Sequence, residues 1–254
     1  MNASALHKEF NNWKIKNRQH GRQAFSRFMM LKFLDALSAV SNDFIFKGGN
    51  LLWHYIGTPR QTIDLDLVTI KSTSHHTVKK SLNQASKFYS EVEFSVKEFK
   101  EIDTPTYSAA AAIVGYKTVS GQLNQFSLDI VYALPTETSK VKSTINGNFY
   151  ISASIENIIA DKIQAAHKFG SGNTRMKDFD DLWRISKSDL EIDGDVLKKL
   201  LMRKQISCIL DAKWIPNLKD SWLKHSKLYK EVPSELDVIF TEVNSWLNSL
   251  NVSL

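Results

Sequence analysis

The sequence predicts an α+β fold in which strands and helices occupy separate parts of the chain. Three observations support this prediction. Apolar residues recur at helical spacing within residues 1–42, and short apolar or alternating runs typical of strands lie within residues 43–135. Helical patterns then dominate residues 154–254. We therefore expect a small mixed sheet flanked by helices, followed by a helical C-terminal part.

The boundary between these parts is expected near residue 150. Residues 136–153 are predicted to form a polar connector with a turn at Asn146-Gly147-Asn148. This divides the chain into a first domain over residues 1–150 and a helical domain over residues 151–254.

The composition excludes several classes of protein. Apolar residues make up 43% of the chain and charged residues 24%, as in globular proteins. No stretch approaches the ~20 apolar residues that span a membrane, and the N-terminus lacks a secretory pattern. The single cysteine, Cys208, excludes an internal disulfide and favours a cytoplasmic protein. We assign His75-His76 to a polar loop without partners at zinc spacing, so no zinc site is expected.

The first predicted strand leads into a glycine turn. Phe44-Ile45-Phe46 is a short apolar run typical of a buried strand, and Lys47-Gly48-Gly49 ends it. Asn50 is expected to cap a helix that runs to Gly57. Backbone N–H groups at the start of a helix bind anions, so the turn predicts a phosphate site. The alternative is an ordinary strand-turn-helix unit.

Two carboxylates follow on the next predicted strand. Because strand side chains alternate, Asp64 and Asp66 point to one face, while Ile63, Leu65 and Leu67 point to the core. Carboxylates about 7 Å apart repel each other unless a cation lies between them. Mg²⁺ prefers oxygen ligands of this kind, and Mn²⁺ also accepts them. The pair therefore predicts a divalent metal site for a nucleoside triphosphate, with a chance acidic pair as the alternative.

A third carboxylate lies on a later strand, which follows a predicted hairpin turn at Ser120-Gly121-Gln122. Phe126 and Leu128 share one face of this strand, and Asp129 lies on the other. If this strand pairs beside that of Asp64, Asp129 becomes a third metal ligand. Three carboxylates could hold one or two metal ions and lower the pKa of an attacking hydroxyl. A solvent-facing aspartate is the alternative.

A lysine interrupts the apolar stripe of a predicted helix between its cap at Ser154 and its stop at Gly170. At helical spacing, Lys162 falls inside the stripe formed by residues such as Ile155 and Ile158. An inward-pointing lysine needs an anion, which a bound triphosphate would supply, or a path by which its stem reaches water.

Two further acids are predicted on a helix that starts near Asn173-Thr174. Asp178 falls in its first turn, where the helix dipole favours negative charge. This structural role alone is enough to explain an acidic residue at this position. Asp181 lies on the same side and could hold Lys162 or orient an attacking group.

In this order, the motifs Lys-Gly-Gly-Asn, Arg-x-Thr-x-Asp-x-Asp, Leu-Asp-Ile, Glu156–Lys162 and Arg175–Leu182 resemble those of the AbiEii/AbiGii nucleotidyltransferase toxins. This family includes the MenT-type toxins and belongs to the polymerase-β-like superfamily. The resemblance implies a nucleotidyltransferase core, a C-terminal domain that completes the active-site cleft, Mg²⁺ (or Mn²⁺) as cofactor, and NTP as substrate. It also implies a cognate antitoxin as partner, whereas the lack of a long apolar stretch argues against a membrane.

The resemblance assigns roles to individual residues. The metal ligands would be Asp64, Asp66 and Asp129. The catalytic set would be Asp64, Asp66, Lys162, Asp178 and Asp181. The residues that bind substrate would be Lys47, Gly48, Gly49, Asn50, Arg60, Thr62 and Arg175.

The charge of the chain bears on the acceptor. A net charge of +6 and a pI near 9.2 favour polyanions such as RNA. Basic residues are concentrated in two predicted helical segments, and an RNA-binding surface and ordinary solvated helix faces explain them equally well. The residues are Lys14, Lys16, Arg18, Arg22 and Arg27 in the first segment, and Lys198, Lys199, Arg203, Lys204 and Lys213 in the second. Together with the family resemblance, this charge predicts that the acceptor is RNA and that its preferred form is the 3′ end of tRNA. Modification of tRNA would block translation. A catalytically silent binding protein and a protein-nucleotidylating enzyme are the alternatives.

Overall fold

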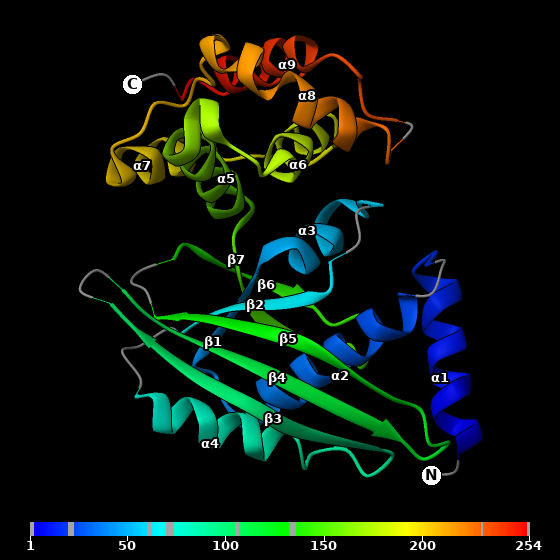
Figure 1. The fold of residues 1–254 in the computed structure, drawn as a ribbon. Helices are drawn as coiled ribbons and strands as arrows, with labels where there is room; N and C mark the ends of the chain where they lie inside the picture. The colour runs from blue at the N-terminus through cyan, green and yellow to red at the C-terminus, as the bar shows by residue number, and fades with distance from the viewer. Residues whose placement is uncertain are drawn as a thin grey trace. The chain divides into compact units, whose positions relative to one another are not determined.

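The computed structural model describes residues 3–19, 23–59, 62–69, 74–104, 107–132, 136–229 and 231–252. The chain divides into two compact units (Figure 1). The first extends to Ala153 without Tyr55–Thr58, and the second consists of Tyr55–Thr58 and the chain from Ser154 onward.

The first unit is built on a mixed sheet. Within the described residues this sheet has seven strands, in the order β3-β4-β5-β2-β1-β7-β6. Strand β2 pairs antiparallel with β1 and parallel with β5. The strands are β1 (Phe44–Lys47), β2 (Asp64–Thr69), β3 (Val92–Asp103), β4 (Ser108–Thr118), β5 (Leu123–Tyr132), β6 (Thr138–Lys142) and β7 (Phe149–Ala153). The predicted mixed sheet is confirmed.

Helices α2 and α4 cover one face of this sheet (Figure 1). The ring of Phe33 on α2 packs against Phe94 of β3 and Phe126 of β5, which places the core on this face. The helices of the first unit are α1 (Ala3–Lys16), α2 (Ala24–Val40), α3 (Gly48–Ile56) and α4 (His75–Ala85). The assignment of His75-His76 to a loop was wrong, because the Ser74 side chain accepts a hydrogen bond from the Thr77 N–H and caps α4 there.

The predicted connector over residues 136–153 was also wrong in part. It forms the hairpin of β6 and β7, and β7 joins the main sheet parallel to β1, with Phe46 opposite Ser152. Its turn lies where the sequence predicted it, with Gly147 at φ +80°. Strand β6 (Thr-Ser-Lys-Val-Lys) is polar, and its strand character comes from pairing with β7, whose Phe149, Tyr150 and Ile151 are typical strand residues.

The second unit is helical, as its patterns predicted. Ser154 caps its first helix by accepting from the Asn157 N–H, and Gly170 ends that helix at φ +49°. Trp222 is fully buried, and Phe179 packs against Phe240. The helices are α5 (Ile155–Phe169), α6 (Met176–Ser186), α7 (Gly194–Lys204), α8 (Ile215–Ser226) and α9 (Leu236–Ser249).

Candidate active site

Three carboxylates of the first unit come together on the sheet. Asp66 lies directly opposite Asp129 in the parallel pairing of β2 and β5. Asp64, Asp66 and Asp129 each offer an oxygen, and these oxygens lie within 4.8 Å of one another. The predicted pairing of the two strands is therefore confirmed.

The opposite face of β2 is apolar, with one exception to the prediction. Leu65 and Leu67 are fully buried. Ile63, however, is 65% exposed because β2 begins only at Asp64. The alternation that orients the acids starts at the first of them.

The electrostatics of this cluster favour a cation. Burial raises the pKa of Asp129, and the nearby Asp64 carboxylate raises it further. A divalent ion would remove this repulsion, and a set of carboxylate oxygens suits hard cations such as Mg²⁺ or Mn²⁺. The residues present therefore fit the metal that the sequence predicts.

Gly48 makes room for one of these carboxylates. Its φ is +77°, and a Cβ at this position would lie 1.8 Å from Oδ2 of Asp66. Strand β1 ends here, with Lys47 opposite Asp66 in the antiparallel register. The glycine turn and the acidic cluster are thus one structural unit.

Asn50 does not cap helix α3, contrary to the sequence prediction. The helix already begins at Gly48, directly after β1, so Asn50 lies in its first turn and is 1% exposed. Its Nδ2 donates to the carbonyl oxygen of Asp64 at 2.6 Å, and its Oδ1 accepts from Nε of Arg27 at 3.2 Å. The amide therefore faces the protein interior.

The other predicted substrate contacts in the first unit are placed as follows. Lys47 is half-buried at the end of β1, and Gly49 is buried in α3. Thr62 is buried, and within the described chain its Oγ1 has no hydrogen-bond partner. Arg60 lies outside the described residues.

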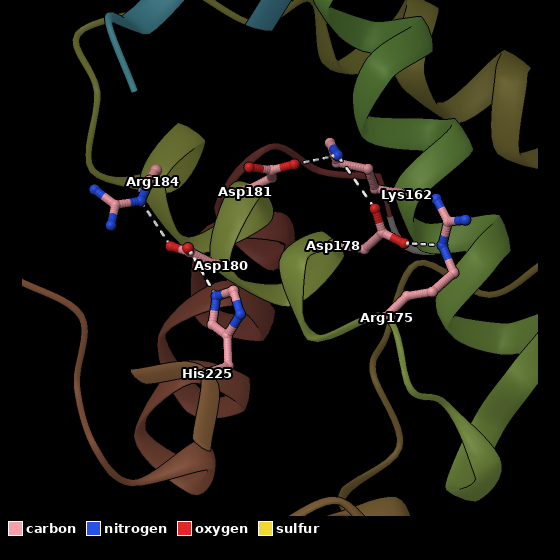
Figure 2. Close-up of polar contacts among 7 residues, drawn as sticks. All are labelled: Lys162, Arg175, Asp178, Asp180, Asp181, Arg184 and His225. Carbon is pink, nitrogen blue, oxygen red and sulfur yellow. Dashed lines mark hydrogen bonds and ion pairs between the residues drawn. The ribbon is translucent and has the colours of Figure 1, made fainter. Parts of the chain in front are cut away.

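Lys162 of the second unit forms ion pairs with two carboxylates of helix α6 (Figure 2). Its Nζ lies 2.5 Å from Oδ2 of Asp181 and 3.3 Å from Oδ1 of Asp178. Nε of Arg175 lies 2.8 Å from the other Asp178 oxygen. Burial by itself would raise the pKa of Asp178, but Lys162 and Arg175 outweigh it and hold this pKa below its usual value. The helix starts at Met176, slightly later than predicted, and Asp178 lies in its first turn.

A further buried acid on α6, Asp180, was not among the functional residues predicted from the sequence. Asp180 accepts a hydrogen bond from Nε of Arg184 at 2.6 Å, and Nε2 of His225 on α8 lies 3.0 Å from its other oxygen (Figure 2). The spacing of Asp180 and Arg184, four residues apart on one helix, was the available signal. This contact fixes α8 to α6.

Comparison with solved structures identifies the fold. A suggested nucleotidyltransferase from H. pylori matches with a TM-score of 0.60 and 18% identity, over 91% of this chain and 96% of that chain. JHP933 from Helicobacter pylori matches with a TM-score of 0.58 and 19% identity, over 91% and 93%. The comparison with curated protein sequences found no significant match.

The family model that matches this chain defines its class, a nucleotidyltransferase. The family described as "Nucleotidyl transferase AbiEii toxin, Type IV TA system" matches residues 32–237, where TA denotes toxin–antitoxin. The chain belongs to this family, which confirms the resemblance seen in its motifs. Within the described residues, none of the helices is both long and apolar enough to cross a membrane.

Proposed function

We propose that the protein transfers a nucleotide from an NTP to RNA in a Mg²⁺-dependent reaction, with a tRNA 3′ end as acceptor, and so blocks translation. The observation that carries this proposal is the cluster of Asp64, Asp66 and Asp129 beside the Gly48 turn. The toxin family adds an antitoxin as the partner that restrains the activity.

In the proposed reaction, an RNA hydroxyl oxygen bonds to the α-phosphorus of the NTP. The bond from that phosphorus to the bridging oxygen of the β-phosphate breaks, and pyrophosphate leaves. The hydroxyl proton passes to a carboxylate of the cluster. Bound Mg²⁺ would neutralise the phosphates and lower the pKa of the hydroxyl. Asp64, Asp66 and Asp129 would hold the metal, and the backbone at Gly48 and Gly49 would receive the phosphates.

Lys162 is proposed to neutralise charge on the departing pyrophosphate. Asp178 and Asp181 orient it, since both accept hydrogen bonds from its Nζ. Arg175 shares Asp178 with it and is 48% exposed, which leaves its guanidinium available to phosphate.

The proposed RNA acceptor finds support on helix α4. Its exposed side carries basic and amide side chains around a hollow of about 530 Å³, lined by His76, Lys79, Lys80, Asn83, Gln84 and Lys87. The helix contains no acidic residue. Within the described part of the chain, no carboxylate forms an ion pair with these basic groups. Such a stripe attracts a phosphodiester backbone.

Arg27, by contrast, does not belong to the exposed basic cluster that the sequence predicted as an RNA-binding surface. It is 7% exposed and donates to Asn50 and Gln19 inside the first unit. Lys204 of the second basic segment donates hydrogen bonds to Asp161 and Gln164.

The reaction is tested by incubating the pure protein with each α-labelled NTP and Mg²⁺, together with total RNA or with lysate protein. We expect label on RNA, its loss with EDTA, and its loss in Asp66→Ala. Asp103→Ala, which removes an exposed acid outside the cluster, is the control. Label on protein would support the protein-nucleotidylating alternative, and unconsumed NTP would support a silent binding protein.

The RNA surface is tested by reversing Lys79, Lys80 and Lys87 to Glu in the Asp66→Ala background. Reversal of Lys117, Lys140 and Lys142, which lie on other elements, is the matched control because both triple changes alter the charge equally. We expect only the α4 variant to lose RNA affinity, by about 10-fold or more at physiological salt, and to show a shallower salt dependence. Equal losses in both variants would attribute binding to total charge alone.

A further inference from the structure

The side chain of Asn50 occupies a place where strand β1 no longer reaches β2. The antiparallel register runs from Phe44 opposite Thr69 to Lys47 opposite Asp66. Two residues further, Gly49 would lie opposite Asp64, but the chain has already turned into α3 at Gly48. On this side, the described residues therefore include no strand residue opposite Asp64.

The Asn50 amide replaces that missing strand. Its Nδ2 donates to the Asp64 carbonyl at 2.6 Å, so it acts as a backbone N–H of β1 would act. On the other side of β2, Asp64 pairs with Ser127 of β5. The first residue of β2 is thus held from both sides, one of them through a single buried side chain.

Arg27 of α2 in turn fixes the Asn50 amide. Its Nε donates to Oδ1 of Asn50 at 3.2 Å, which leaves Nδ2 directed at Asp64. The guanidinium also donates to Oε1 of Gln19 at 2.7 Å and lies 4.9 Å from the ring centroid of Trp53. A guanidinium that is 7% exposed needs such contacts, because burial of an unpartnered charge is costly.

From this chain of contacts we infer that Asn50 and Arg27 are positioning residues for the metal-binding carboxylate of Asp64. Asn50 fixes the start of β2, and Arg27 acts through Asn50. This inference rests on the metal-dependent function proposed above. It gives both residues roles other than those predicted from the sequence, because the contacts of the Asn50 amide and the Arg27 guanidinium described above lie within the first unit.

The test measures Mn²⁺ affinity by the loss of the free-ion signal in electron paramagnetic resonance, without nucleotide or RNA. We expect Asn50→Ala to weaken Mn²⁺ binding about 10-fold, the lower end for residues that orient metal ligands. Arg27→Met should weaken it by a similar or smaller factor. The free energy of unfolding is measured in parallel, so that affinities are compared only between folded proteins.

Tyr150→Phe is the matched control, since it removes a buried hydrogen bond of the same unit that ties Asp35 of α2 to β7 rather than to β2. It should lower stability while leaving Mn²⁺ affinity unchanged. If Asn50→Ala and Tyr150→Phe both leave the affinity unchanged, Asn50 is merely structural and the inference is overturned.

The double variant tests whether Arg27 acts through Asn50. If it does, Asn50→Ala with Arg27→Met binds Mn²⁺ as weakly as Asn50→Ala alone, because the two effects share one route. Multiplied effects would show that Arg27 acts independently. Wild-type protein that binds no Mn²⁺, or binds it equally well as Asp64→Ala, would instead contradict the proposed metal site itself.

Discussion

Gly48 lies beside the carboxylate of Asp66, a proposed metal ligand. Its place between a strand and a helix predicts a role in phosphate binding. A second requirement acts on the same residue, because the place of its absent side chain is taken by Asp66. The two requirements are compatible, since a turn that leaves room for the carboxylate also exposes backbone N–H groups to a metal–phosphate complex.

Substitution of this glycine separates backbone strain from the carboxylate contact. Gly48→Ala should cost about 1–2 kcal/mol of stability for its positive φ and, by displacing Asp66, lower Mn²⁺ affinity about 10–100-fold. Gly121→Ala is the control, because Gly121 has φ +84° and open space around its missing Cβ. Circular dichroism in urea and Mn²⁺ titration measure the two quantities. A similar loss of Mn²⁺ affinity in both variants would contradict this account.

The acids of the site were predictable from sequence, but the roles of Asn50 and Arg27 were not. Alternation along a strand is a local rule, so the spacing of Asp64 and Asp66 alone is enough to place them on one face. The role of Asn50 depends on where β1 ends relative to β2, which is a tertiary fact. Its capping propensity pointed instead to a helix N-terminus at Asn50, whereas α3 already begins at Gly48.

At the scale of elements, the Lys162 cluster joins α5 to α6. Lys162→Met would leave Asp178 and Asp181 buried without this cation, so we expect a loss of about 3–5 kcal/mol in unfolding free energy. Adding Asp178→Asn and Asp181→Asn should restore most of that stability by removing the buried charges. Urea denaturation measures both changes.

Nucleotide transfer distinguishes the catalytic role of this lysine from its structural role. The stabilised triple variant should remain inactive, because it has no cation for pyrophosphate. Recovery of transfer together with stability would show that Lys162 serves the fold alone.

Helix α2 is tied to β7 through a buried acid whose charge depends on pH. Burial raises the pKa of Asp35 from 3.8 to about 6, although it accepts a hydrogen bond from Tyr150. The folded state therefore keeps a proton that the unfolded chain releases near pH 4. As a result, this contribution to stability is present below that pH and is lost as the pH rises through about 6.

Asp35→Asn should remove this pH dependence. The wild type should lose up to about 3 kcal/mol between pH 4 and 7 through this group, whereas the variant keeps a neutral side chain throughout. Urea denaturation of both proteins across this range provides the measurement. Parallel pH profiles for wild type and variant would contradict the assignment of this proton to Asp35.

Elements with strong local signals were predicted most accurately. The cap at Ser154 and the stop at Gly170 predicted the bounds of α5, and apolar residues at helical spacing predicted helix within residues 1–42, where α1 and α2 lie. Strands β6 and β7 were missed because β6 is polar and becomes a strand only by pairing with β7, although Phe149, Tyr150 and Ile151 of β7 were an available signal. The start of helix α4 was wrongly predicted, since His75-His76 was assigned to a polar loop although Ser74 is a good cap.

At the scale of the whole molecule, the carboxylate cluster and the Lys162 cluster belong to different compact units. A metal held only by Asp64, Asp66 and Asp129 should stabilise the first unit by mass action. At ten times its Kd, Mg²⁺ should add about 1.4 kcal/mol there.

Hydrogen exchange followed by mass spectrometry resolves this effect along the chain. We expect slower exchange with Mg²⁺ in peptides from β1, β2 and β5, and little change in peptides from α7, α8 and α9. Asp66→Ala should abolish the difference. Equal protection of both units would show that they unfold as one, against the division described above.

The closeness of Gly48 to Asp66 has a consequence for genetics. The side chain of any other residue at position 48 would occupy the space of the Asp66 carboxylate, while we expect the surrounding helices and strands to stay folded. Bacteria selected to survive unrestrained production of this toxin should therefore collect missense changes at codon 48. Such escape alleles would yield normal amounts of an inert protein, in contrast to alleles that truncate the chain.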